Sequence, residues 1–355
     1  MTNNDATVMT RCYALIFQII PSDFMNCNWN DSAIDSLYQD IMQPLIDGLA
    51  NENDVLLQMS LLEILETTGR NTEEGRGRQE LIQNWNNADL DKILLRMVGF
   101  PKGDLHPFCA GAALRILAIK GDQVHSRMEE DSLMTGEEFV NVLVHFGRKM
   151  NGEIEKIGFI DGITTFCSLS LRNLELVLEN QELLEEWLNL RRGQSKLKAV
   201  VMSSLANVLI SRLELEQLQE QDLRNKSHAT KLKLFQKIGI VNDLGRGQDS
   251  SEIIMDHVKG QVVELRLAAY GLLAGVARIN LGAHMLMRFG GFFEFLCNRN
   301  LEVVKEGKLL KFALVNAVVE SDVTGFLAEG TVKTLKQVVA DGPFFVKQVW
   351  DVALE

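Results

Sequence analysis

The feature that most constrains the fold is an apolar segment of helix length that recurs along the chain, with small residues near its centre. Its copies span residues 55–69, 107–121, 155–170, 196–210, 264–279 and 308–321. The equivalent positions are separated by 52, 49, 39, 71 and 42 residues, and they are Leu65, Leu117, Phe166, Leu205, Val276 and Val318. Each copy ends at a turn and is followed by another amphipathic stretch. One such unit cannot bury its apolar face alone, whereas a stack of units can.

Two residue patterns inside the copies indicate how they pack. Residues 110–113 read Ala-Gly-Ala-Ala, and Ala268, Ala269 and Gly271 form a similar run, so neighbouring helices can approach closely. Leu and Val recur three, four and seven residues apart, which is typical of one buried helix face. A spacing of about 40–50 residues with two or three helices per unit is the signature of armadillo and HEAT arrays. The sequence predicts an all-α fold, an armadillo/HEAT-like right-handed α-solenoid.

The predicted organisation has three parts. Residues 1–30 form a poorly defined N-terminal segment or cap. Residues 31–340 form the solenoid of about six to seven helical repeats, and the long step across residues 211–260 holds an extra helical pair, an insertion or an irregular repeat. Residues 341–355 form a C-terminal tail that begins with Asp341-Gly342-Pro343, a sequence that stops a helix because proline lacks the donor N–H.

Charge and cysteine usage limit the possible partners. The formal net charge is −12, which disfavours nonspecific binding to nucleic acid or to an anionic membrane and favours a cationic protein surface. Salt-sensitive association kinetics are therefore expected. The five cysteines are widely spaced without a CxxC pair, which favours free thiols in a reducing compartment. The apolar run at residues 11–20 is too short to span a bilayer, which takes about 20 residues, and no convincing cleavage site follows it.

Catalytic signals are weak throughout the sequence. The six histidines are scattered without an HExxH pattern, and residues 245–250 resemble a phosphate-binding glycine loop only loosely, without a predicted strand before them. Glu182, Glu185 and Glu186 share one helix side, where a solvated surface explains them better than paired catalytic carboxylates. We expect no catalytic residues, no metal site and no cofactor. An enzyme built on helical repeats would need a concentrated polar pocket, which no residue constellation predicts.

The last hundred residues carry a more specific pattern. Residues 265–300, 308–319 and 339–349 resemble, in order, the C-terminal part of the 26S proteasome non-ATPase regulatory subunit 5 family, and the resemblance extends mainly over residues 195–350. The shared features are an alanine-rich helix, a Leu-Met pair, a Gly-Phe turn with Glu close behind, an Asn/Asp-Arg pair, a Leu-Val helix and a Gly-Pro-aromatic-aromatic-Val-Lys ending. They fall on Ala268 and Ala269, Leu286 and Met287, Gly291, Phe292 and Glu294, Asn298 and Arg299, Leu314 and Val315, and Gly342 to Lys347.

This resemblance implies a non-enzymatic chaperone for assembly of the base of the proteasome regulatory particle. Such a protein binds the C-terminal domain of one ATPase-ring subunit, holds the other base subunits of the precursor and leaves before the mature 26S particle forms. It implies a cytoplasmic and nuclear protein that is monomeric when free. A generic armadillo-type adaptor or scaffold, unrelated to the proteasome and binding short extended peptides, is the alternative.

Two sets of residues are candidates for the interaction surface. Polar residues on the final helix of several repeats are predicted to face the concave side and bind the partner, although ordinary exposed helix positions would look the same: Arg115, Asn207, Arg278 and Asn316. In the tail, Phe344 and Phe345 are predicted to cover the apolar end of the last repeat. The alternative for these two rings is a free ligand motif, which would leave a sticky exposed patch.

Overall fold

The computed structural model describes residues 43–51, 54–70, 88–99, 106–121, 134–211, 220–239 and 249–345. Within these ranges the regular elements are all helices, and no β-strand is present. The chain divides into two compact units, residues 1–187 and residues 188–355. The all-α class of stacked helical repeats predicted from the sequence is therefore confirmed within each unit.

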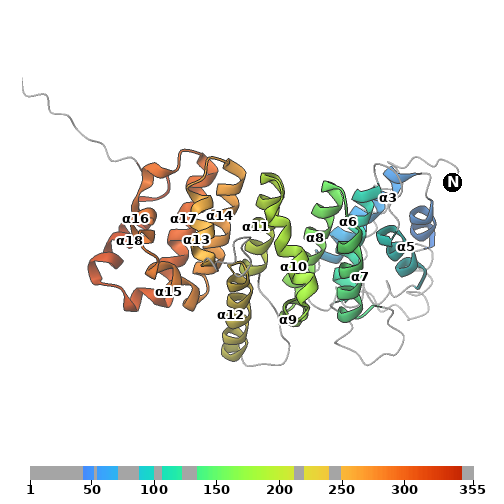
Figure 1. The fold of residues 1–355 in the computed structure, drawn as a ribbon, viewed down its shortest axis with the longest axis horizontal. Helices are drawn as coiled ribbons and strands as arrows, with labels where there is room; N and C mark the ends of the chain where they lie inside the picture. Colours follow the sequence, from blue (N-terminus) through green and yellow to red (C-terminus); the bar gives the residue numbers. More distant parts are fainter. Residues whose placement is uncertain are drawn as a thin grey trace, which may run out of the picture. The chain divides into compact units, whose positions relative to one another are not determined.

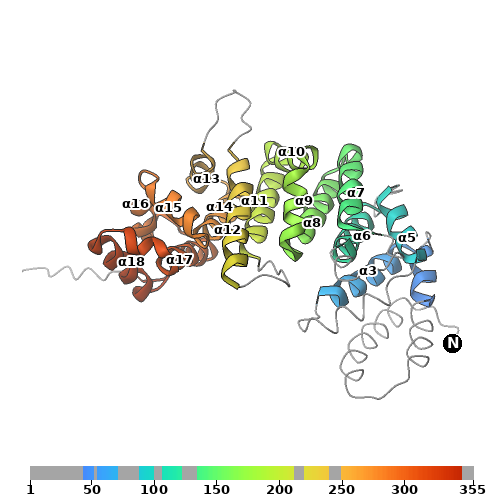
Figure 2. The ribbon, with the colours of Figure 1, turned by 90° about the horizontal axis from the view of Figure 1, so that it is seen from below.

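The first unit is built around helix α6 (His106–Gly121). This helix packs against α3 (Val55–Arg70), α5 (Ala88–Gly99), α7 (Gly136–Lys149) and α8 (Glu153–Leu169). Figure 2 shows α6, α7 and α8 as neighbours, and α9 (Leu171–Glu179) packs on α7 and α8. Helix α10 (Gln181–Asn189) follows, and the division between the units falls within it. Because α6 is enclosed by four helices, twelve of its residues are buried.

The second unit is built around helix α14 (Val263–Ala277), which packs between α11 (Ser195–Ile210) and α17 (Lys305–Glu320). Figure 1 shows α13 (Ser250–Val258) beside α14. The remaining elements are η2 (Leu190–Arg192), α12 (Glu220–Lys237), α15 (Asn280–Arg288), α16 (Phe292–Cys297), η3 (Arg299–Leu301), η4 (Asp322–Phe326) and α18 (Glu329–Asp341). Helix α18 packs on α16 and α17 and is the last helix described.

All six predicted apolar segments form helices, namely α3, α6, α8, α11, α14 and α17. Within the first unit α3 packs on α6 and α6 on α8, and within the second α11 packs on α14 and α14 on α17. The predicted N-terminal segment, residues 1–30, lies outside the described residues. The region from 211 to 260 contains α12 and α13, two helices that contact each other.

Small residues set the distance between the central helices, as the sequence predicts. A Cβ atom added to Gly158 of α8 would lie 2.8 Å from the Cα atom of Gly111 in α6, so the two backbones touch. In the second unit, a Cβ added to Gly275 of α14 would lie 2.9 Å from the Cβ of Leu209 in α11. At Gly271 the same test gives only an ordinary contact of 3.6 Å with Ala206.

Polar contacts fix individual helices of the first unit. Thr135 and Glu138 form a capping box at the start of α7: the Thr135 hydroxyl accepts a hydrogen bond from the Glu138 N–H (3.1 Å), and the Glu138 carboxylate accepts one from the Thr135 N–H (2.6 Å). Between α5 and α6, the Lys120 amine forms a buried ion pair with the Asp91 carboxylate. Burial lowers the pKa of Lys120, although the Asp91 charge opposes this effect. None of the helices in the described ranges has the length and apolar character needed to cross a membrane.

Candidate partner-binding pocket

A small pocket lies in the second unit between α16, α17, α18 and the segments that join them. Its apolar walls are formed by Leu296, Phe312, Val315, Val338 and Pro343. Its charged lining is formed by Arg299, Glu302, Lys308 and Lys311. Apolar walls with a few charged groups that converge on one space are typical of sites that bind a specific group.

Two glycines with a positive φ stand at the ends of helices that border this pocket. Gly291 has a φ of 82° and precedes α16, while Gly342 has the same φ and ends α18. A residue with a Cβ atom is strained at such a φ, so both turns need glycine. The prediction that the Asp-Gly-Pro sequence stops a helix is confirmed, because α18 ends at Asp341. The turn places Gly342 and Pro343 in the pocket lining.

Arg299 holds the end of α18 in place. Its guanidinium donates hydrogen bonds to the carbonyl oxygens of Gly342 (2.8 Å) and Val338 (3.1 Å) and pairs with the carboxylate of Asp341 (3.0 Å). The last carbonyls of a helix lack partners within the helix, and a cation there also opposes the negative end of the helix dipole. The guanidinium also lies over the ring of Phe345, 5.1 Å from its centroid. One arginine therefore connects η3 to both α18 and the start of the tail.

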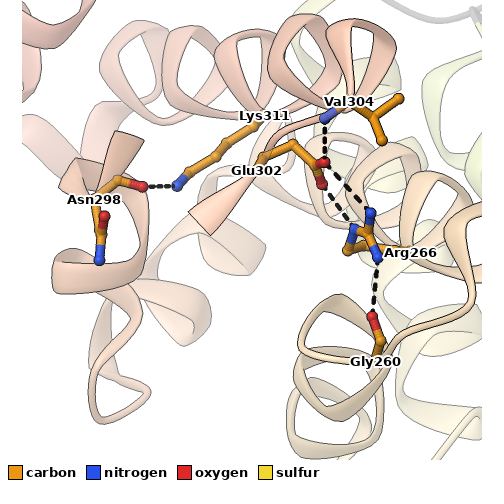
Figure 3. A network of polar contacts seen from close by, with 6 residues as sticks. All are labelled: Gly260, Arg266, Asn298, Glu302, Val304 and Lys311. Carbon is orange, nitrogen blue, oxygen red and sulfur yellow. Dashed lines mark hydrogen bonds and ion pairs between the residues drawn. The ribbon is translucent and has the colours of Figure 1, made fainter. Parts of the chain in front are cut away.

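Glu302 connects the pocket to the preceding layer, as Figure 3 shows. Its carboxylate accepts hydrogen bonds from Arg266 Nε of α14 (2.8 Å) and from the Val304 N–H (2.9 Å), while Arg266 also donates to the carbonyl oxygen of Gly260 (3.0 Å). Burial by itself would raise the pKa of Glu302, but the hydrogen bonds from Arg266 and Val304 outweigh it and hold the pKa below its usual value. Glu302 is therefore an ionised group at neutral pH, even though only 1% of its surface is exposed.

Lys311 of α17 is the other buried charge of the pocket. Its amine donates a hydrogen bond to the carbonyl oxygen of Asn298 (Figure 3) and lies over the ring of Phe295, 4.7 Å from the centroid. Burial lowers the pKa of Lys311 to about 8; the interactions with Cys297 and Glu302 oppose this effect, and the charge of Arg299 adds to it. The amine is thus still protonated in most molecules at pH 7, and it is poorly solvated because Lys311 is only 6% exposed.

The charges of the pocket do not balance. Arg299 is paired with Asp341, and Glu302 with Arg266. Within the described residues, no carboxylate lies at ion-pair distance from the amine of Lys308 or of Lys311. The pocket therefore carries an excess of two positive charges in a chain whose formal net charge is −12.

The four residues predicted to bind a partner are divided between the two units. Arg115 belongs to the first unit and pairs with Glu66 (2.8 Å) and Asp161 (3.6 Å), so it links α6 to α3 and α8. Asn207 is exposed on α11, Arg278 is exposed at the end of α14, and Asn316 is half-buried on α17. These three lie in the second unit on helices that pack in succession. Their role in partner binding stays a prediction.

The two tail aromatics lie at the described end of the chain. Phe344 is 50% exposed and Phe345 is 46% exposed. Phe345 contacts the Arg299 guanidinium through its ring face, and the Pro343 that precedes the pair lines the pocket. Residues 346–355 of the predicted tail lie outside the described residues, and whether the tail covers the last repeat stays a prediction.

Sequence reasoning did not identify Glu302, Lys308 or Lys311 as site residues. Arg299 was noticed only as part of an Asn-Arg pair, without a role. The available signal is an isolated glutamate between Leu301 and Val303, followed by two lysines three residues apart on a helix that is otherwise largely apolar. That spacing places both lysines on one side of α17. No group of three or more His, Cys, Asp or Glu side chains suited to a metal ion occurs among the described residues.

The fold and the pocket define a class, an all-α protein of stacked helical repeats with a charged pocket at its last described layers. Residues 243–355, which include every residue that lines the pocket, match a family model described as proteasome non-ATPase 26S subunit. A search of curated proteins gives no match. Among solved structures, a designed armadillo repeat protein is 14% identical with a TM-score of 0.46, covering 78% of this chain and 98% of its own. An engineered protein is 9% identical with a TM-score of 0.25, covering 96% of both chains.

Proposed function

We propose that this protein is a non-enzymatic chaperone for assembly of the base of the proteasome regulatory particle. In this proposal it binds the C-terminal domain of one ATPase-ring subunit, keeps the base precursor together and leaves before the mature 26S proteasome forms. The observation that carries the proposal is the match of residues 243–355 to proteasome non-ATPase 26S subunits, because the same segment builds the charged pocket.

The structure supports a role in binding over one in catalysis. Stacked helices offer an extended surface, and such proteins act by covering part of a partner. In the proposed mechanism, the chaperone occupies the face that an ATPase subunit needs for its neighbour in the ring or for docking on the proteolytic core. Release then follows when the assembled ring competes for that face. The protein acts in the cytoplasm and the nucleus and is monomeric when free.

The first test is purification of the tagged protein from native lysate, followed by mass spectrometry of the bound proteins. The expected result is recovery of ATPase-ring and other base subunits without peptidase subunits of the 20S core. The tag expressed alone is the control. Recovery of complete 26S particles in equal amounts would show a resident subunit instead, and the absence of proteasome proteins would favour a general adaptor.

The binding rate gives a second test of the same proposal. Because the chain carries a net charge of −12, its association with a base subunit is expected to slow as salt is raised. Rates measured by stopped flow should fall between about 50 mM and 500 mM salt, since screening shortens the reach of the charges. A rate independent of salt would remove electrostatic steering from the mechanism.

A further inference from the structure

The two unbalanced lysines of the pocket point to the chemistry of its ligand. A buried ammonium group that lacks a carboxylate partner is costly, and an anion brought to it would relieve that cost. Lys311 is 6% exposed and uses one of its three donors on the Asn298 carbonyl oxygen. Lys308, which is half-buried, lines the same pocket. The positive charge of the pocket therefore favours binding of an anion.

The remaining lining restricts which anion fits. Five of the ten lining residues are apolar, so the anion must come with apolar surface around it. Glu302 also lines the pocket and is held ionised by Arg266, so a group with two negative charges, such as a phosphate, would be repelled more strongly than a group with one. A carboxylate carries a single negative charge, and a charge-assisted hydrogen bond from Lys311 to it is stronger than a neutral one.

Exposed apolar side chains lie beside two of the pocket residues along the chain. Leu301 and Val303, the chain neighbours of Glu302, are 55% and 79% exposed. Phe344 and Phe345, which directly follow Pro343, are about half exposed. A bound segment that contacts both pairs of side chains needs apolar residues before and after its carboxylate. An Asp or Glu side chain within a chain meets this need, whereas a chain-terminal carboxylate has residues on one side only.

We propose that this pocket is a docking site for an internal acidic residue of a partner protein, an Asp or Glu flanked by apolar residues on both sides. The carboxylate binds the amines of Lys311 and Lys308, and the flanking side chains contact the exposed side chains of Leu301, Val303, Phe344 and Phe345 beside the pocket. This inference deepens the proposed function, and it rests on that function for the expectation that the ligand belongs to a protein.

The test uses the full chain with labelled methyl groups and three short peptides. The first is Ac-Ala-Leu-Glu-Leu-Ala-NH2, the second replaces its Glu by Gln, and the third carries Gln and a free C-terminal carboxylate. Dissociation constants are measured by NMR titration, with the methyl signals of Leu296, Val315 and Val338 as reporters of the pocket. The Glu peptide is expected to bind about tenfold more tightly than the Gln peptide, the ratio expected from one charge-assisted hydrogen bond.

Two matched variants assign the preference to the pocket. Lys311→Met keeps the length and apolar stem of the side chain but removes the charge, and it should reduce the ratio between the Glu and Gln peptides to about one. Lys305→Met removes the same charge from an exposed position of α17 that does not line the pocket, and it should leave the ratio unchanged.

Several outcomes would overturn the inference. Equal binding of the Glu and Gln peptides would show that the carboxylate is not recognised. Tighter binding of the peptide with the free C-terminus would assign the pocket to a chain end. If none of the peptides changes the methyl chemical shifts of the three reporter residues at millimolar concentration, the pocket does not bind them and the proposed site is refuted. If any of these results is found and base subunits are still recovered from lysate, the docking site is refuted and the proposed function stands. If only the lysate test fails, the proposed function alone is refuted.

Discussion

Gly307 shows how tightly the charged layer beneath the pocket is packed. A Cβ atom at this position would lie 2.5 Å from the carboxyl carbon of Glu302 and 2.8 Å from one of its oxygens. The carboxylate cannot move aside without losing hydrogen bonds to Arg266 and Val304. Glycine is needed at position 307 because there is no space for a Cβ atom. Its backbone conformation does not require glycine, since among the described residues a positive φ occurs only at Gly291 and Gly342.

The substitution Gly307→Ala should therefore destabilise the protein by about 1–3 kcal/mol, the usual cost of forcing an extra carbon into a packed site. The measurement is the free energy of unfolding from denaturant titration. Gly330→Ala is the matched control, because Gly330 also lies in a helix and an added Cβ would meet no atom within 4 Å. The control should be neutral or up to about 1 kcal/mol more stable, since alanine favours helices. Equal effects of the two changes would show that Glu302 adapts freely.

Lys231 of α12 provides a test based on pH. It is 6% exposed, and its amine donates a hydrogen bond to the carbonyl oxygen of Ser211. Burial, with the nearby charge of Arg278, lowers the pKa of Lys231 to about 8, from a usual value of 10.5. Between pH 8 and pH 10.5 the unfolded chain therefore binds more protons at this residue than the folded chain, so this lysine favours folding increasingly as the pH rises.

Lys231→Met removes this contribution and keeps the apolar stem. Relative to wild type, the variant should be most stable near pH 7, and its relative stability should decline as the pH rises from 8 to 10.5. Other titrating groups are common to both proteins and cancel in the difference, while loss of the Ser211 hydrogen bond adds a constant. The measurement is the difference in unfolding free energy at several pH values. A difference that stays constant across this range would mean that Lys231 titrates normally.

At the scale of elements, the contact between α6 and α8 depends on two facing glycines. A Cβ on Gly158 would lie 2.8 Å from the Gly111 Cα, a backbone atom that cannot rotate away. Gly158→Ala should push the helices apart and lower the free energy of unfolding by about 1–3 kcal/mol. Gly99→Ala at the end of α5 is the control, since its Cβ would meet no atom within 4 Å. A Gly158→Ala variant as stable as this control would show that the helix pair accommodates a wider spacing.

The helices were largely predictable because the residue pattern that defines each helix lies within its own segment of the sequence. The six central helices begin and end within three residues of the predicted segments, since apolar periodicity and small residues are properties of the segment itself. The pocket was not predictable, because its charges are defined by partners far away in sequence. Arg266 and Glu302 are 36 residues apart, and Arg299 reaches Gly342 across 43 residues. Neither contact produces a periodic pattern in the sequence. The ion pair between Arg115 and Glu66, 49 residues apart, could not be predicted for the same reason, and the role of Arg115 in partner binding stays a prediction.

At the scale of the whole molecule, the division into two compact units leads to a prediction about folding. A fragment of residues 190–355 keeps η2 and every later helix of the second unit. Its central helix α14 keeps its contacts with α11, α13, α15 and α17, so we expect the fragment to fold on its own. The measurement is circular dichroism at 222 nm during thermal unfolding. A fragment without a cooperative transition would show that the second unit needs the first in order to fold.

The polar links between successive layers also have a consequence for synthesis on the ribosome. Arg115 pairs with a residue 49 positions earlier, and Arg266 and Arg299 pair with residues 36 and 42 positions later. Each of these ion pairs is complete once the next layer of helices has left the exit tunnel. These pairs join only neighbouring layers, and domains generally fold from the N-terminus during translation. A nascent chain of this kind can add one finished layer at a time, so little apolar surface stays uncovered while the remainder is being made.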